Sequence, residues 1–126
     1  MSQRTPLARV RGLGSAKEGT DHFWKQRLTA VSNLILVCFL IWLLVRLAGA
    51  DYATVKHTLA RPQNAIPLLL LVLSGVMHMR LGMQTIIEDY VHSEGRKVVA
   101  LMLNSFFAIL VGLTSAFAVL KLSFGA

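Results

Sequence analysis

The sequence predicts an all-α membrane protein that crosses the bilayer with three transmembrane helices. Of its 126 residues 55% are hydrophobic, and the mean hydropathy is +0.60. These values are typical of membrane proteins. Three long apolar stretches lie at about residues 28–50, 64–87 and 98–122, and each can cross a hydrocarbon core about 30 Å thick. We therefore divide the chain into a basic N-terminal tail, residues 1–19, and a membrane anchor domain, residues 20–126.

The first span has clear signals at both ends. Thr20 or Asp21 can cap the start of a helix, and Phe23 and Trp24 suit the membrane interface. The only charge in the apolar stretch is Arg46, which is near enough to its end to extend toward the head groups. We expect the helix to begin outside the hydrocarbon.

The second and third spans are separated from their neighbours by polar segments. Pro62 is tolerated in a first helical turn and Asn64 can cap, so we expect the second span to start near Asn64. Residues 51–64 are expected to be a polar connection. Residues 88–97 are expected to form a short polar turn that ends at Gly95.

Two sets of residues inside the spans point to helix packing or to a ligand. Small residues recur at four-residue spacing in the third span and predict a seam for close helix approach: Ala108, Gly112 and Ala116. Polar residues occupy the first two turns of the first span: Thr29, Ser32 and Asn33. The polar set either bonds neighbouring helices or lines a ligand cavity.

The charge distribution indicates a partner and an orientation. The 13 Lys and Arg exceed the 6 Asp and Glu, but they cluster outside the apolar stretches, so we expect membrane lipid and no nucleic acid as a partner. Residues 1–27 and the 88–97 turn carry eight Lys or Arg, whereas the opposite side has Arg46, Lys56, Arg61 and Lys121. The N-terminus is therefore expected in the cytoplasm and the C-terminus in the periplasm of a bacterial inner membrane. A mitochondrial inner membrane is the less favoured alternative.

The single cysteine limits the metal chemistry of the chain. Cys38 lies in an apolar stretch, so no intrachain disulfide can form and no zinc or iron–sulfur site can be built from cysteines of this chain alone. A metal would have to be bound by histidine or carboxylate, or by partner chains.

His78 stands in the second span about 16 Å along the helix from Pro67. On a helix, Gly75, His78 and Gly82 share one stripe. A flat ligand coordinated by the imidazole needs such clearance, so we interpret the stripe as a haem slot with His78 as an iron ligand. An interhelical hydrogen bond from His78, with the glycines as a packing notch, is the alternative.

Three further candidate residues lie in the second span or just beyond its end. Tyr90 can donate a hydrogen bond to a quinone carbonyl, and Asp89 can orient it or relay protons. An interfacial tyrosine with a solvated acid is the alternative. If the first two spans are antiparallel neighbours, this pair is expected within a turn or two of Arg27 and Ser32. Arg80 points about 200° from His78 and faces another direction.

Three sequence segments resemble the hydrophobic membrane anchor (D) subunits of succinate dehydrogenase, complex II. They are Asp21-His22-Phe23 followed by Arg27-Leu28-Thr29-Ala30, then His78 with Gly82-Met83, and Asp89-Tyr90-Val91. The resemblance covers residues 20–126. The first 19 residues and Arg80 lie outside it.

The resemblance implies half of a heterodimeric anchor bundle in succinate:ubiquinone oxidoreductase, without catalytic residues of its own. His78 would be one axial ligand of haem b, and the sister cytochrome b anchor subunit would supply the other. Tyr90, with Asp89 beside it, would bind ubiquinone, and Arg27 would lie near the haem propionates. Succinate oxidation would belong to flavoprotein and iron–sulfur subunits, linking the tricarboxylic acid cycle to respiratory electron transport.

A function of another class fits the same sequence. In this alternative the chain is a small helical transport or assembly protein that uses His78 and Arg80 in a proton or substrate path.

Overall fold

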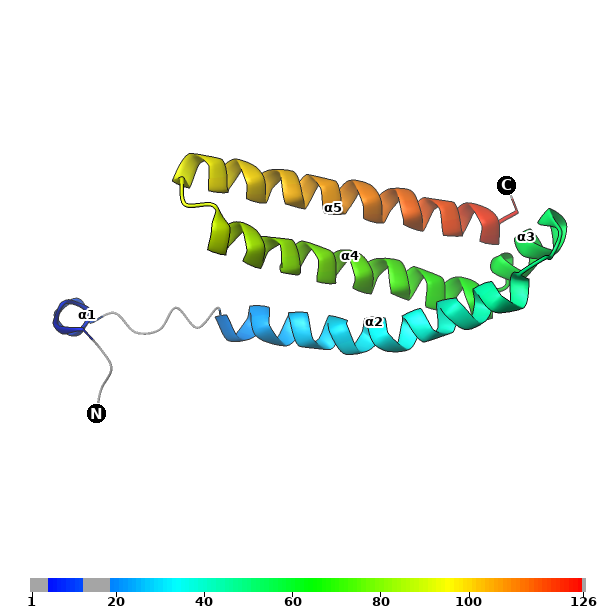
Figure 1. The fold of residues 1–126 in the computed structure, drawn as a ribbon, viewed down its shortest axis with the longest axis horizontal. Coiled ribbons are helices and arrows are strands. Elements are labelled where there is room, and N and C mark those ends of the chain that lie inside the picture. The colour runs from blue at the N-terminus through cyan, green and yellow to red at the C-terminus, as the bar shows by residue number, and fades with distance from the viewer. Residues whose placement is uncertain (1–4, 13–18, 126) are drawn as a thin grey trace.

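The computed structural model describes residues 5–12 and 19–125, and every regular element in them is an α-helix. The elements in order are α1 (Pro6–Val10), α2 (Gly19–Leu47), α3 (Tyr52–Ala60), α4 (Pro62–Tyr90) and α5 (Glu94–Ser123) (Figure 1). Helices α2, α4 and α5 are long and apolar enough to cross a membrane. The predicted all-α class with three candidate spans is confirmed.

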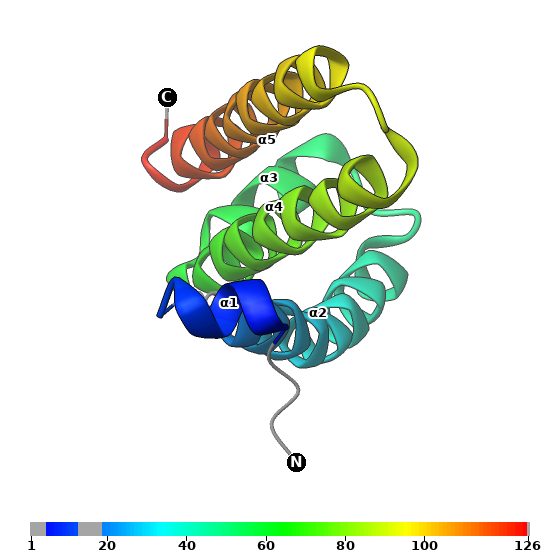
Figure 2. The same cartoon turned by 90° about the vertical axis from the view of Figure 1, so that its left-hand side faces the viewer.

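Helix α4 lies in the middle of the bundle. It packs against α2 on one side and α5 on the other, as both ribbon views show (Figures 1 and 2). The start of α2 and the α4–α5 connection lie at one end of the bundle. Helix α3 and the C-terminus lie at the other end (Figure 1). Neighbouring long helices are antiparallel.

Some of the predicted boundaries are wrong. The expected polar connection at 51–64 contains α3, where Asp51 precedes the first turn and Arg61 separates α3 from α4. Gly95 lies inside α5 rather than ending a turn, and α2 stops at Leu47, followed by Gly49 with φ +79°. Helices α2 and α4 have 29 residues each, about 44 Å, because they extend beyond the apolar stretches from which the spans were predicted.

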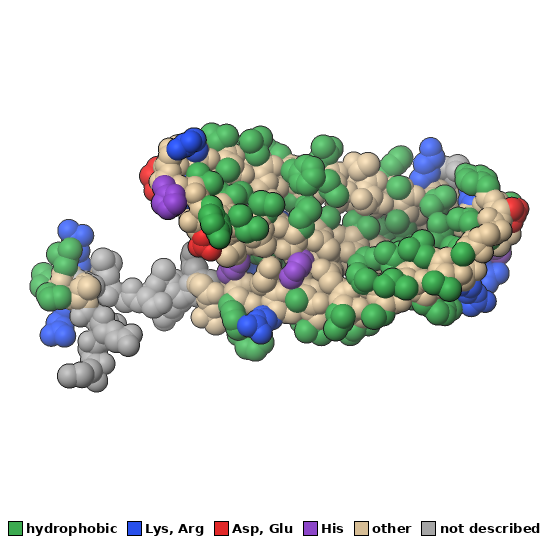
Figure 3. All heavy atoms as spheres, viewed as in Figure 1, with side chains coloured by type: hydrophobic (Ala, Val, Ile, Leu, Met, Phe, Trp, Pro, Cys, Tyr) green, Lys and Arg blue, Asp and Glu red, His purple; other side chains and the backbone are tan. Residues whose placement is uncertain are grey.

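Most large apolar side chains of the bundle lie on its outer faces, where Figure 3 shows them over all three long helices. Among the described residues the buried apolar ones are Leu43, Ala65, Ile87 and Ala108. An exterior of this kind suits a lipid or another transmembrane chain as its neighbour.

Helices α4 and α5 approach each other closely along a seam of small residues. Ala108 is 1% exposed, and a Cβ atom added to Gly112 would lie 3.5 Å from Val76 Cγ1. Asn104, one turn before Ala108, donates from Nδ2 to the Arg80 backbone oxygen at 2.9 Å. The packing role predicted for Ala108 and Gly112 is confirmed, and Asn104 adds a polar contact that the spacing did not reveal.

Candidate functional site

The His78 imidazole is held from the neighbouring helix by Thr29. His78 Nδ1 lies 3.1 Å from Thr29 Oγ1, and Thr29 is only 7% exposed. The threonine hydroxyl also lies 2.8 Å from the Lys25 carbonyl oxygen, to which it donates. A hydroxyl has one proton. When that proton is donated to the Lys25 carbonyl, the Thr29 oxygen accepts from His78 Nδ1–H, and the lone pair of the neutral imidazole is on Nε2.

This arrangement leaves Nε2 of His78 available. The structure records no hydrogen bond to it from any described residue, and His78 is half-buried. One turn away on α4, Ser74 Oγ donates to the Thr29 backbone oxygen at 3.3 Å. Two contacts from α4 therefore fix the same turn of α2, and the imidazole is oriented before any ligand binds.

The two glycines that flank His78 have different surroundings. A Cβ atom on Gly75 would meet nothing within 4 Å, whereas one on Gly82 would lie 3.4 Å from Gln26 Nε2. The expected clearance is therefore present at Gly75. At Gly82 the Gln26 side chain from α2 lies within van der Waals contact of such a Cβ atom, so the clearance beside His78 is wider at Gly75 than at Gly82.

A groove of about 520 Å³ lies between α2 and α4, next to the His78 turn. We call it the Arg80 groove; its lining includes His22, Lys25, Arg80 and Gln84. Histidine side chains are visible at the boundary between the two helices in Figure 3. Among the described residues, the Nε2 atom of His22 and the Oε1 atom of nearby Gln26 are buried without a hydrogen-bond partner. Unpaired buried polar atoms are uncommon, so His22 and Gln26 can each form a further hydrogen bond on this face.

Sequence reasoning missed most of the residues on this face of α2. It named His22 only within the Asp21-His22-Phe23 segment and assigned nothing to Gln26. The signal was present, since positions 22, 26, 29 and 33 are polar and recur at helical spacing. Asn33 continues the stripe, and its Oδ1 is also buried without a partner.

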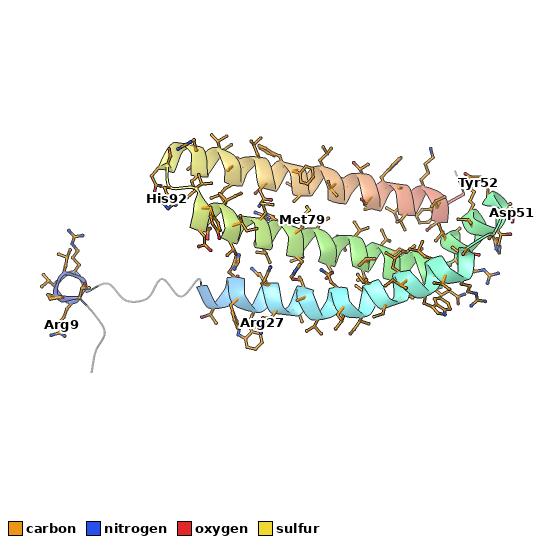
Figure 4. All side chains as sticks on the ribbon, viewed as in Figure 1. Arg9, Arg27, Asp51, Tyr52, Met79 and His92 are labelled. Atoms are coloured by element: carbon orange, nitrogen blue, oxygen red, sulfur yellow. The ribbon has the colours of Figure 1, made fainter. Side chains whose placement is uncertain are left out.

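Arg27 lies on the opposite face of α2 from Thr29. Its side chain is exposed and its guanidinium stacks over the Phe23 ring, 4.8 Å from the centroid. Figure 4 shows Arg27 pointing away from α4. Within this chain the structure does not bring Arg27 and His78 together.

Asp89 and Tyr90 end α4, and both are exposed, Tyr90 to 78%. Tyr90 borders a cavity of about 320 Å³ together with His92 and Arg96, and Asp89 does not line it. His92 and Arg96 had no predicted role. They became neighbours of Tyr90 only through the bend between α4 and α5.

The expected proximity of Tyr90 to Arg27 and Ser32 is wrong. Gly82 lies opposite Gln26, and Tyr90 is eight residues, or about 12 Å, beyond Gly82 along α4. Tyr90 is therefore level with the first turn of α2, which begins at Gly19.

The described residues contain no group of three or more His, Cys, Asp or Glu able to hold a metal ion. A haem iron needs less from the protein, because the porphyrin fills the four equatorial positions and leaves only axial ligands to be supplied. One oriented imidazole with a free Nε2, beside the open Gly75, fits half of such a site.

Comparisons with known proteins agree along almost the whole chain. A family described as "Succinate dehydrogenase/Fumarate reductase transmembrane subunit" matches residues 1–112. No solved structure matches the chain significantly.

Similar proteins include two bacterial anchor subunits. The chain is 32% identical to the succinate dehydrogenase hydrophobic membrane anchor subunit of Rickettsia bellii, over 85% of this chain and 86% of that protein. It is 30% identical to the protein of the same name from Paracoccus denitrificans, over 97% and 94%. None of these matches favours the transport or assembly alternative. The chain belongs to the succinate dehydrogenase/fumarate reductase transmembrane subunit family, and within it to the hydrophobic membrane anchor subunits of succinate dehydrogenase.

Proposed function

We propose that this anchor subunit supplies one axial ligand of haem b and one part of a ubiquinone reduction site. The observation that carries the haem part is the hydrogen bond between Thr29 Oγ1 and His78 Nδ1. Histidines that bind metals usually donate their second N–H to a fixed acceptor, which sets the tautomer and the ring orientation. Thr29 is such an acceptor.

The surroundings of His78 support a ligand shared with another chain. Gly75 is open on its own face, and this chain has no second histidine in the middle of a span. The second axial ligand would come from the sister cytochrome b anchor subunit. When bound, haem b accepts and returns single electrons. In this chain Thr29 orients the imidazole, and Gly75 has no side chain, which leaves room beside the ring.

Two of the predicted haem contacts have weaker support within this chain. Gly82 accommodates Gln26, so its role would be to let α2 approach the His78 turn. Arg27 faces away from α4, so it would reach a haem propionate only on the outer face of α2, where the sister subunit would pack.

The quinone part rests on the last turn of α4. The Tyr90 hydroxyl is exposed beside a cavity that also contains His92 and Arg96. A phenol can donate to one quinone carbonyl, and a nearby cation favours the charge that develops on a reduced oxygen. Asp89, exposed in the same turn, would exchange protons with solvent.

The other subunits would dock at the end of the bundle that carries Tyr90. Iron–sulfur and flavoprotein subunits on that side would deliver electrons from succinate directly to the quinone. The excess of Lys and Arg in residues 1–27 and in the first turn of α5 favours the cytoplasm of a bacterial cell for this end.

The haem proposal is tested on the complex purified with its partner subunits. His78→Ala is expected to abolish the b-type band in the reduced-minus-oxidised spectrum, because one iron ligand is lost. His57→Ala, on α3 outside the spans, is the control and should retain the band. An unchanged band and haem content in the His78 variant would show that the iron is bound elsewhere.

The quinone proposal is tested with Tyr90→Phe, which removes only the hydroxyl. We expect ubiquinone reduction to fall by about two to four orders of magnitude, the usual contribution of one positioned general acid or base. Succinate oxidation by an artificial acceptor should stay near the wild-type rate. If both activities fall equally, Tyr90 supports assembly and does not bind quinone.

A further inference from the structure

A second cationic cavity lies at the opposite end of the bundle from Tyr90. It has a volume of about 350 Å³ and lies where the end of α2, helix α3 and the start of α4 meet. We call it the Arg46 cavity; its lining includes Trp42, Arg46, His57, Thr58, Arg61 and Asn64. Neither the family nor the proposed haem and quinone sites account for it.

The cations of this cavity have no acidic partner in the part of the chain that the structure describes. The one ion pair there joins Lys25 and Asp21, at the other end of α2. The nearest acid in sequence is Asp51. The Thr54 hydroxyl holds the pKa of the exposed Asp51 carboxyl below its usual value, so Asp51 is ionised, but it forms no ion pair with Arg46 or Arg61. Within the described residues the two guanidinium groups are therefore unpaired and can bind an external anion.

The cavity is built from fixed elements. Asn64, which is buried, donates from Nδ2 to the Thr58 backbone oxygen at 2.8 Å and ties α3 to α4. The Arg46 guanidinium lies over the Trp42 ring, 5.3 Å from its centroid. Arg61 has extended backbone angles between the two helices. The two guanidinium groups are thus supplied by α2 and by the α3–α4 junction, and the Asn64 hydrogen bond fixes that junction.

The surroundings of Arg46 and Arg61 suit an amphiphilic ligand, which has a charged group and an apolar chain. Guanidinium groups bind phosphate oxygens through paired hydrogen bonds. The neighbouring outer face of α2 is apolar and unpacked, with Ile41 and Val45 both more than half exposed. Arg46 ends a candidate span and Arg61 precedes the next, which is the depth of lipid head groups. We propose that the Arg46 cavity binds the phosphate of an anionic phospholipid, with an acyl chain along the outer face of α2.

A lipid explains the cavity better than a protein carboxylate does. Topology alone favours cations on the other side of the membrane, so Arg46 and Arg61 need another reason to be here. Basic pockets between membrane helices on the cytoplasmic side bind anionic lipid head groups, and we extend the same chemistry to the opposite end of the bundle. A partner carboxylate would satisfy the charge but would leave the adjoining apolar face of α2 without an occupant.

The test measures the phospholipid retained by the complex purified with its partner subunits. Arg46→Gln with Arg61→Gln removes two charges inside the cavity. Lys56→Gln with Lys121→Gln is the matched control, because it removes two charges at the same end of the bundle but outside the cavity lining. Each complex is incubated with vesicles of phosphatidylcholine and phosphatidylglycerol, and bound lipid is counted by native mass spectrometry.

We expect the arginine variant to retain at least five-fold less phosphatidylglycerol than wild type, and the lysine variant to retain nearly the wild-type amount. Glycerol phosphate, which has no acyl chain, should not displace the lipid. If the double arginine variant does not assemble, Arg46→Gln alone is measured, with the same direction expected. Haem content is recorded in parallel and should not change.

Four results would overturn the proposal. Equal lipid retention in wild type and the arginine variant would show that the cavity holds no lipid. Equal losses in both double variants would indicate general surface attraction. Displacement by glycerol phosphate would indicate a site for small anions. Loss of the sister subunit with unchanged lipid would assign the cavity to a partner carboxylate.

Discussion

The two faces of α4 are built differently. Toward α5 it meets the seam of Asn104, Ala108 and Gly112, where two backbones approach closely. Toward α2 it meets a polar stripe in which Thr29 bonds His78. The first face is satisfied within the chain, and the second leaves buried atoms of α2 unpaired.

The α4–α5 and α2–α4 interfaces therefore have different roles. Close packing of small residues holds membrane helices together without a hydrophobic driving force, so the α5 face fixes α4 in place. The α2 face then presents an oriented imidazole from a helix that cannot shift easily. Unpaired polar groups on that face are expected to gain partners when a ligand or the sister subunit binds.

The largest effect is expected when the seam is broken by Gly112→Leu. A Cβ atom at position 112 already lies 3.5 Å from Val76 Cγ1, so Gly112→Ala should be tolerated, whereas a leucine must displace α4. Overpacking of this kind costs about 1–3 kcal/mol or more. We expect a large fall in the yield of assembled complex and in its thermal midpoint.

The control for this change is Leu110→Ala, on the exposed face of α5. It changes side-chain size by a similar amount but touches no seam residue. If Gly112→Leu assembles as well as Leu110→Ala, the seam does not fix α4.

An intermediate effect is expected from substitution of Thr29, the α2 residue that contacts His78 on the polar face of α4. Thr29→Val keeps the shape but leaves His78 Nδ1–H without an acceptor, at a cost of about 1–3 kcal/mol. A less basic imidazole stabilises oxidised iron less, so the haem midpoint potential should rise. Redox titration of the purified complex measures this shift.

Thr29→Ser restores the hydroxyl and should return the potential to near the wild-type value. A structural role alone would change stability without changing the potential. If Val and Ser variants have the same potential as wild type, Thr29 does not act on the iron ligand.

The sequence predicts the helices and the seam well because both depend on local composition and periodicity. Apolar stretches longer than a bilayer identify α2, α4 and α5. Ala108 and Gly112 recur at the spacing of one helix face. Helix α3 was missed, since its nine residues are too short and polar to stand out from a connection.

The candidate site was less predictable because it depends on how two helices are rotated. Sequence spacing placed His78 between two glycines but could not tell that Gln26 would lie close to Gly82. It also could not tell that Thr29 faces α4 while Arg27 faces outward. These contacts depend on the rotation and register of α2 relative to α4, which cannot be read from a single sequence.

The smallest effect is expected from Asn104→Ala in the seam. The Arg80 carbonyl loses one donor, but it has a second lone pair for its helical bond, so little is left unsatisfied. Interhelical hydrogen bonds in membranes average about 0.6 kcal/mol, and the thermal midpoint of the complex should fall only slightly. Ser105→Ala, half-buried beside it, is the control. A fall as large as that from Gly112→Leu would mean that α4 is held to α5 by this hydrogen bond, and the contrast between a packed face and a bonded face would not hold.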